Sequence, residues 1–125
     1  MKKEFFEALT GDVELVSLVG TMRGASGGLP CIFFDAPGSF NDLPAVSFFE
    51  KESADLVFAD DECIAGNIVM QVDVWAKAEV SAVCGAVDRV ARELGYHRHS
   101  CADVPDPNIQ HITAMYKKFK FKGGF

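Results

Sequence analysis

Several features are scarce or missing in this sequence of 125 residues, and each absence argues against a class of protein. The four cysteines form no CxxC pair, which argues against a dithiol redox motif or a zinc ribbon. No apolar run reaches the roughly 18 residues that span a bilayer, and Glu4 and Glu7 interrupt the N-terminal apolar residues. We therefore expect no signal peptide, no membrane span and reduced thiols in a cytoplasm.

Catalytic signatures are also missing. The sequence contains no GxSxG, Walker A, GxGxxG or HExxH pattern. The glycine-rich stretch "GASGG" lacks the lysine and the following helix that a phosphate-binding loop requires, so it is expected to be a plain loop. No cofactor is indicated. The net charge of −6 argues against a protein that grips nucleic acid through a basic face.

What the chain does contain is typical of one globular domain covering residues 1–125. Hydrophobic residues make up 49% and charged residues 24%, and this length can bury a core without disulfides or a metal. The clearest element is a helix from about Glu79 to Leu94, where apolar residues recur at i, i+3 and i+4. Gly95 stands where a glycine commonly ends a helix.

The stretch "CIAGNIVMQVDVWAK", Cys63 to Lys77, alternates as a half-buried strand does. One face of this strand is apolar and carries Ile64, Ile68, Met70, Val72 and Val74. The other face carries Asn67, Gln71, Asp73 and Trp75. We expect the apolar face to pack under the helix and the other face to be open to solvent in a monomer.

Shorter elements complete the predicted fold. Two short helices precede Gly20, the second capped by Asp12. Their expected inward faces are Phe5, Phe6 and Leu9 in the first, and Val13, Val16 and Val19 in the second. Strands are expected over Cys31 to Phe34, Ala45 to about Lys51, and the C-terminal "IQHITAMYKKFKF". Together these elements predict an α+β domain, with a small antiparallel or mixed sheet, one long helix packed on it and short N-terminal helices.

Asp73 is the first candidate for chemistry, because a carboxylate on a strand face can serve as a general base. Its own strand offers no histidine or second acid two or four residues away. Carboxylates that form sites normally have partners that shift their pKa. We therefore favour a solvated side chain or a subunit contact for Asp73 and its neighbour Trp75.

The segment "HRHSC" is the second candidate. If it is extended, His97, His99 and Cys101 point the same way and could bind zinc. A fourth ligand is not identified, and nothing in the sequence brings His111 close. An exposed polar strand or loop is the favoured interpretation, and a small cytosolic enzyme or metal-binding protein is the alternative. Cys84 lies on the apolar helix face and is expected to be a core thiol. Cys31 and Cys63 begin apolar strands and are interpreted in the same way.

Charge is distributed unevenly along the chain. Acidic residues cluster in mid-chain, at Asp55, Asp60, Asp61 and Glu62, within a segment from Ser53 to Glu62 that we expect to be a hairpin loop or flap. Lysines cluster near the C-terminus, at Lys117, Lys118, Lys120 and Lys122. The lysines suit an edge strand protected from aggregation, or a contact with an acidic surface, better than a nucleic-acid stripe.

The strand and helix of "IVMQVDVWAKAEVSAVCGAVDRVARELG" resemble the core of the tail-completion, or tail-terminator, proteins of long-tailed phages and prophages. The family pattern is a strand of the form "hQhDhWA", with h apolar, leading into a helix; Met70 to Ala76 match it residue by residue. "DVELVSLVG" and "LPAVSFFE" resemble two further family segments. The stretch from Ile32 to Asn41 is longer and more apolar than the family pattern, and "HRHSCADVPDP" has no counterpart in it.

The resemblance implies a structural protein without catalytic residues. It implies a ring, commonly a hexamer, that caps the tail tube and docks it to the head connector. The implied partners are other copies of the chain, the tail tube protein and the head-connector proteins, while DNA passes through without specific binding. The implied location is the tail–head junction of the virion, after synthesis in the bacterial cytoplasm. A ligand-binding α+β module remains a further alternative, although no patterned pocket supports it.

A ring needs two different complementary surfaces on each subunit. We therefore hypothesise that Asp55, Asp60, Asp61 and Glu62 contact the lysines of a neighbour, at Lys117, Lys118 and Lys120, or line a channel for DNA. Asp73 and Trp75 are the other candidate subunit contacts. The segment Ser53 to Glu62 is hypothesised to be disordered until a partner arrives.

Overall fold

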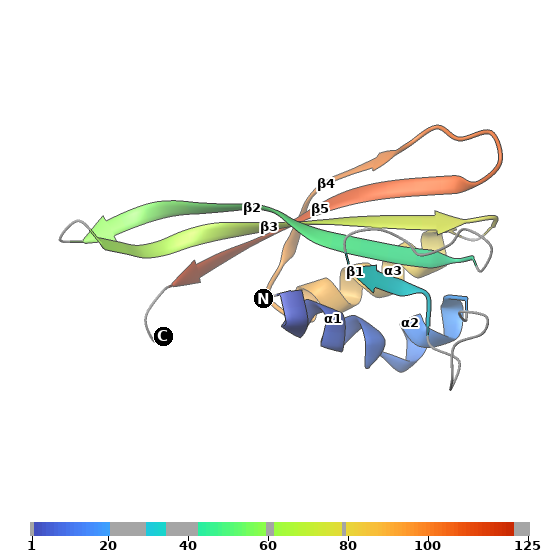
Figure 1. The fold of residues 1–125 in the computed structure, drawn as a ribbon, viewed down its shortest axis with the longest axis horizontal. Helices are drawn as coiled ribbons and strands as arrows, with labels where there is room; N and C mark the ends of the chain where they lie inside the picture. The colour runs from blue at the N-terminus through green and yellow to red at the C-terminus, as the bar shows by residue number, and fades with distance from the viewer. Residues whose placement is uncertain (1, 21–29, 35–42, 60–61, 79, 122–125) are drawn as a thin grey trace.

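A computed structural model describes residues 2–20, 30–34, 43–59, 62–78 and 80–121; for residues 2, 34, 52–59, 62–65, 120 and 121 it describes only the backbone. Within this part of the chain, three helices lie on one side of a five-stranded sheet (Figure 1). In chain order the elements are α1 (Lys2–Thr10), α2 (Val13–Leu18), β1 (Ile32–Phe34), β2 (Ala45–Ala59), β3 (Glu62–Ala76), α3 (Val80–Glu93), β4 (His97–Asp103) and β5 (Gln110–Phe121).

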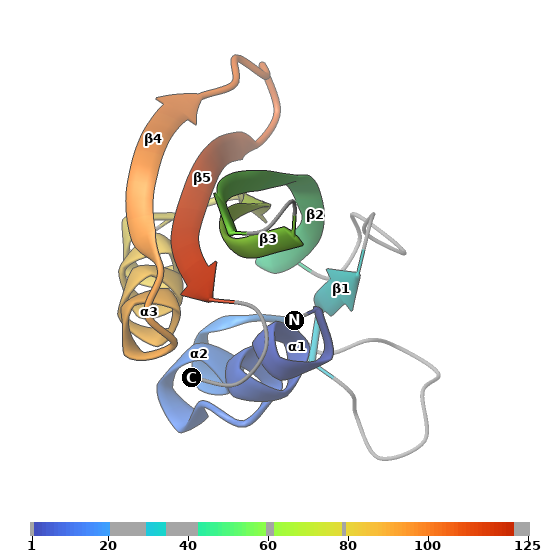
Figure 2. The same cartoon turned by 90° about the vertical axis from the view of Figure 1, so that its left-hand side faces the viewer.

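The sheet has the strand order β1-β2-β3-β5-β4. The short strand β1 runs parallel to β2, whereas the other neighbours are antiparallel. The sheet is therefore mixed, and it curves strongly when seen from its end (Figure 2). The predicted fold class is confirmed: the domain is α+β, with one long helix and two short N-terminal helices.

Helix α3 is the element that the sequence predicted most closely. It covers Val80–Glu93, against the expected Glu79 to Leu94. Gly95 has a φ of 92°, in the left-handed region that favours glycine. The backbone N–H of Gly95 donates to Arg92 O at 3.0 Å, and that of Tyr96 donates to Ala91 O at 3.0 Å. This pair of bonds is the Schellman arrangement, so Gly95 ends the helix for the predicted reason.

The hydrophobic core fills the space between the sheet and the helices. Strand β3 contributes Met70, Val72 and Val74, as predicted, and α3 contributes Val83, Val87 and Val90. Aromatic rings join the N-terminal helix to this core, since the Phe5 and Phe48 centroids are 5.1 Å apart. The alternation of β3 therefore corresponds to a helix-covered face and a helix-free face.

The predicted inward faces of the two N-terminal helices were only partly right. Phe5 and Leu9 are fully buried, but Phe6 is 39% exposed, because a residue next to Phe5 lies about 100° further around the helix. In α2 the buried residue is Leu15, whereas Val13 is 85% exposed. Val19, just past the helix, is buried as expected.

The acidic mid-chain segment was predicted to be a loop or flap, and this was wrong for Ser53 to Ala59. Strand β2 continues to Ala59 and pairs with β3 along its whole length, so the two strands form a long hairpin that extends past the helices (Figure 1). Register shifts fall between Glu50 and Glu52, Asp55 and Val57, and Val57 and Phe58. Such irregularities interrupt the two-residue alternation by which a strand is recognised in a sequence. Asp60 and Asp61 lie outside the described residues.

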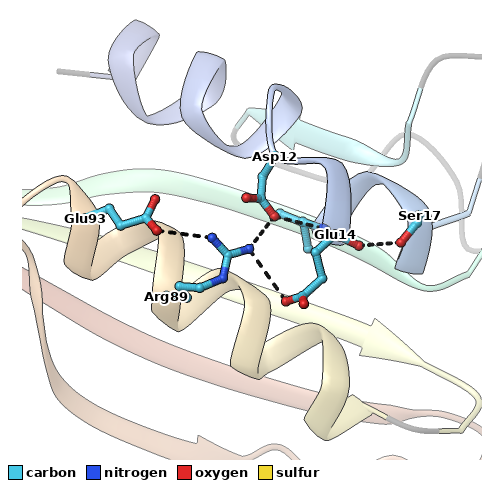
Figure 3. Close-up of polar contacts among 6 residues, drawn as sticks. Asp12, Glu14, Ser17, Arg89 and Glu93 are labelled. Carbon is cyan, nitrogen blue, oxygen red and sulfur yellow. Dashed lines mark hydrogen bonds and ion pairs between the residues drawn. The ribbon is translucent and has the colours of Figure 1, made fainter.

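Arg89 of α3 joins the helices to one another (Figure 3). Its Nη2 lies 2.6 Å from Asp12 Oδ2 and 3.5 Å from Glu14 Oε1, and its Nη1 lies 3.2 Å from Glu93 Oε1. Asp12 also caps α2, because its Oδ2 accepts a hydrogen bond from the Leu15 N–H at 2.9 Å. The bond from Arg89 lowers the pKa of the Asp12 carboxyl, against the opposing effect of burial. Arg89 and Asp12 therefore fix α2 against α3.

Candidate functional site

Asp73 lies on the helix-free face of β3, and of the two predicted alternatives, a solvated side chain or a subunit contact, the first is wrong. It is only 8% exposed. Its Oδ2 accepts a hydrogen bond from Gln71 Nε2 at 3.1 Å, and its Oδ1 lies 3.1 Å from His111 Nε2. The histidine comes from β5, where it stands across from Trp75. A search along one strand could not find this partner, because it is 38 residues away in sequence.

Trp75 is partly buried and is also held by His111. The two rings are stacked, with centroids 4.5 Å apart and an interplanar angle of 25°. The imidazole thus contacts the carboxylate with one atom and the indole with its face. Thr113 stands directly across from Asp73, and its Oγ1 is buried without a hydrogen bond to any described residue. Gln71, Asp73, Trp75 and His111 form a connected group, which we call the Asp73 cluster.

The order of strands decides what the Asp73 cluster can do chemically. In a serine-type triad the imidazole stands between the hydroxyl and the carboxylate. Here Ser47 of β2 pairs with Asp73 on one side, and β5 supplies His111 on the other side. The carboxylate, rather than the imidazole, therefore lies on the strand between the other two. The imidazole of His111 is not placed to activate Ser47. The cluster instead orients the Trp75 ring and links β3 to β5.

The "HRHSC" segment begins strand β4, and all seven residues of β4 are exposed. The exposure was predicted, whereas the prediction had left a strand or a loop open. The expectation that His97, His99 and Cys101 share one direction was wrong. His97 pairs with Lys117 and Cys101 pairs with Ala114, with a register shift between Arg98 and Ser100. Lys117 and Ala114 lie on opposite faces of β5, so His97 and Cys101 do too. The geometric basis for a zinc site in this segment is therefore removed.

No group of three His, Cys, Asp or Glu residues in the described part of the chain has an arrangement suited to a metal ion. Among the cysteines, Cys31 is buried, as expected of a core thiol. Cys84 is partly buried against the core, and burial raises the pKa of its thiol to about 11. A thiol with so high a pKa is a poor nucleophile near neutral pH. The side chain of Cys63 lies outside the described residues.

The acidic and basic segments lie at the same end of the sheet. Asp55 pairs with Gly66 of β3, and Gly66 pairs with Lys120 of β5. Glu62 begins β3 and pairs with Ala59. For Asp55, Glu62 and Lys120 only the backbone is described. The two segments therefore share one end of the same subunit, which the sequence alone did not reveal.

The edge strand that we predicted from the lysines is right only for the end of β5, because β5 lies between β3 and β4 up to Lys117. Lys117 lies opposite His97, on the helix-free face. Lys118 points to the helical layer: its Nζ is 3.9 Å from Glu4 Oε1 and 5.4 Å from the centroid of the Tyr96 ring. The end of β5 past Lys117 pairs with β3 alone. Lys118 thus contributes to the domain's own packing.

Comparison with known proteins provides no family assignment. The chain matches no protein-family model, and no curated protein is significantly similar to it. Within the described residues, no helix combines the length and apolar character needed to cross a bilayer.

Proposed function

We propose that this protein is a structural component of a long-tailed phage or prophage, which terminates the tail tube and joins the tail to the head connector. The proposal rests on the sequence resemblance, and the small α+β fold of the described residues supports it. In this proposal the protein is not an enzyme. It acts by presenting surfaces to copies of itself, to the tail tube protein and to the head-connector proteins.

The observation that carries the proposal is the arrangement of the "hQhDhWA" strand. Its apolar positions, Met70, Val72 and Val74, are buried beneath the helices. Its remaining positions are turned to the helix-free face, where Gln71 and Asp73 are hydrogen-bonded and Trp75 is partly exposed. The pattern therefore specifies apolar residues on the buried face and polar and aromatic residues on the other face. This supports a strand that also forms a contact surface, rather than one that serves only the core.

Trp75 is suited to such a surface. Aromatic residues held in one orientation lose little conformational freedom when a partner covers them, and tryptophan is enriched at the centres of protein interfaces. The stack on His111 provides that orientation. We propose that a neighbouring subunit covers Trp75 and the edge of the Asp73 cluster in the assembled ring.

The negative charge of the chain also agrees with this role. A ring that encloses the path of DNA should let the DNA slide, and a net charge of −6 opposes tight binding to phosphates. In this proposal DNA passes through the ring without sequence-specific contacts. The ring is located at the tail–head junction of the virion, after synthesis in the bacterial cytoplasm.

Inactivation of the gene in the genome that carries it tests this function. The proposal predicts filled heads and unattached tails after induction, and complementation in trans should restore joined particles. A Tyr96→Phe copy, which retains the fold, serves as the matched positive control for complementation. Normal joined virions in the absence of the protein would rule out the proposed role.

A further inference from the structure

The sheet has two long open edges, and they lie on its opposite sides. No described strand pairs with the outer side of β4, over His97–Asp103. On the other side, β1 covers only Val46 to Phe48 of β2. The outer side of β2 from Phe49 to Ala59 therefore has no strand partner among the described residues.

Open edges of this length are unusual in a protein that stays monomeric. Their unpaired backbone groups offer a template for another strand, and proteins normally shorten such edges or interrupt them with proline. Neither edge segment contains a proline, and β4 spans seven residues and the β2 edge eleven, although charged residues and register shifts, which also protect edges, occur in both. All residues of β4 are exposed, so no described helix or loop covers this edge.

The two edges differ in charge. On β4 the formal charges of Arg98 and Asp103 cancel, and Lys117 beside His97 on the next strand adds one positive charge. The β2 edge carries Glu50, Glu52 and Asp55 against a single Lys51. Pairing β2 with another β2 would bring acidic residues together, which is unfavourable for directly opposed residues, whereas pairing β2 with β4 brings them near Arg98 and Lys117. Pairing of unlike edges is favoured instead.

We propose that the β4 edge of one copy pairs with the β2 edge of a second copy, so that the sheets of neighbouring subunits continue into one another. This inference rests on the proposed function, for which it supplies the contact between subunits. The contact is head-to-tail, and repetition of such a contact gives a ring if the rotation between subunits closes. The acidic segment from Ser53 to Ala59 thereby acts as an assembly strand.

Hydrogen exchange of backbone amides tests this pairing directly. The full-length protein is compared in its assembled form and after dissociation by dilution, with size followed by light scattering. On assembly, amides in 97–103 and in 49–59 should exchange at least about tenfold more slowly. Amides in the interior strand β5, over residues 110–117, provide the internal reference and should change little.

Charge reversal provides a second test that does not depend on exchange. Arg98→Glu and Glu52→Arg should each weaken association about tenfold, and their combination should recover most of the loss. Circular dichroism and thermal unfolding at a concentration where all the variants are monomeric show that each folds. Lys77→Glu, at an exposed position just past β3, is the matched control and should assemble as the wild type does.

The outcomes separate this inference from the proposed function. Assembled rings in which 97–103 exchange as fast as in the monomer would overturn the edge pairing and leave the ring function standing. A protein that stays monomeric at the highest soluble concentration would overturn both. Protection of both segments, with mutual rescue by the charge reversals, would support both.

Discussion

His111 Nε2 of β5 lies 3.1 Å from Asp73 Oδ1 of β3, so one imidazole connects a buried carboxylate to the partly exposed ring of Trp75. The carboxylate has two partners, and the tryptophan is held by a ring from the neighbouring strand. The arrangement is structural in its chemistry: it fixes the helix-free face of the sheet in one conformation. Its value for function depends on what covers that face in the assembled protein.

We predict that Asp73 and His111 are energetically coupled. Asp73→Asn and His111→Gln should each lower the free energy of unfolding, and the double variant should lose less than the sum. The coupling should be about 1.5 kcal/mol, at the lower end for a hydrogen bond to a charged group, because the pair is only partly buried. Urea unfolding of the four proteins measures it. His99→Gln, on the fully exposed β4, is the control and should be neutral; strict additivity would show that the pair is not coupled.

The two tyrosines give a matched pair for the value of a buried hydroxyl. Tyr116 Oη donates to Asp88 Oδ1 at 3.2 Å, whereas Tyr96 Oη is buried without a hydrogen bond to any described residue. Tyr116→Phe should cost about 1 kcal/mol, since it leaves Asp88 without one donor. Tyr96→Phe should be neutral or slightly stabilising, because it removes an unsatisfied polar atom and retains the contact with Phe5. Urea unfolding of the two variants should show this difference; equal losses would contradict it.

The Arg89–Asp12 contact should make the free energy of unfolding depend on pH in the acidic range. The hydrogen bond from Arg89 lowers the pKa of Asp12 in the folded protein. Its contribution is therefore complete above the unfolded pKa of about 3.9, and it is lost as the pH falls through the lower folded pKa. Arg89→Met should destabilise the protein at pH 7, and the difference from wild type should shrink towards about pH 2. Denaturant unfolding across this range measures the difference.

A control for the acid dependence is available on the surface. Lys3 and Glu7 form an ion pair at 3.9 Å with both side chains largely exposed. Lys3→Met should change stability little at any pH, because exposed pairs are screened by solvent. If Arg89→Met and Lys3→Met change the free energy of unfolding equally at every pH, the contact between Arg89 and Asp12 contributes nothing to stability.

Trp75 should matter more for association than for folding. Trp75→Ala removes the stack on His111, which is worth about 0.5–1.5 kcal/mol beyond the buried area. At an interface centre the same change commonly costs at least about 2 kcal/mol of binding free energy. Unfolding of the monomer and sedimentation of the assembly separate the two losses. Trp75→Phe should retain part of the free energy of unfolding and part of the free energy of association. Equal losses of both after Trp75→Ala would show that Trp75 stabilises the fold and has no separate role in association.

The sequence predicted the fold wherever local signals and burial agree. Helix α3 has a regular apolar stripe and a glycine that its ending requires, and both were predictable. The buried face of β3 was predicted correctly from Met70, Val72 and Val74. In these cases the residues that decide the structure are neighbours in sequence, or lie within one turn of each other.

The parts that the sequence did not predict depend on pairing between distant strands. His111 meets Asp73 only because β5 lies beside β3 in one register. Strand β2 continues past Lys51 because β3 pairs with it, although irregularities interrupt its alternation. A single register shift in β4 separates His97 from Cys101. Such features are determined by tertiary contacts, which a search for local periodicity does not detect.

The most direct test of the proposed function is electron microscopy of the purified full-length protein at high concentration and low salt, with the mass checked by light scattering. The proposed function predicts closed rings of one size with an open centre. The Trp75→Ala variant should remain as folded monomers. A wild-type protein that remains monomeric in these images and in solution would contradict it.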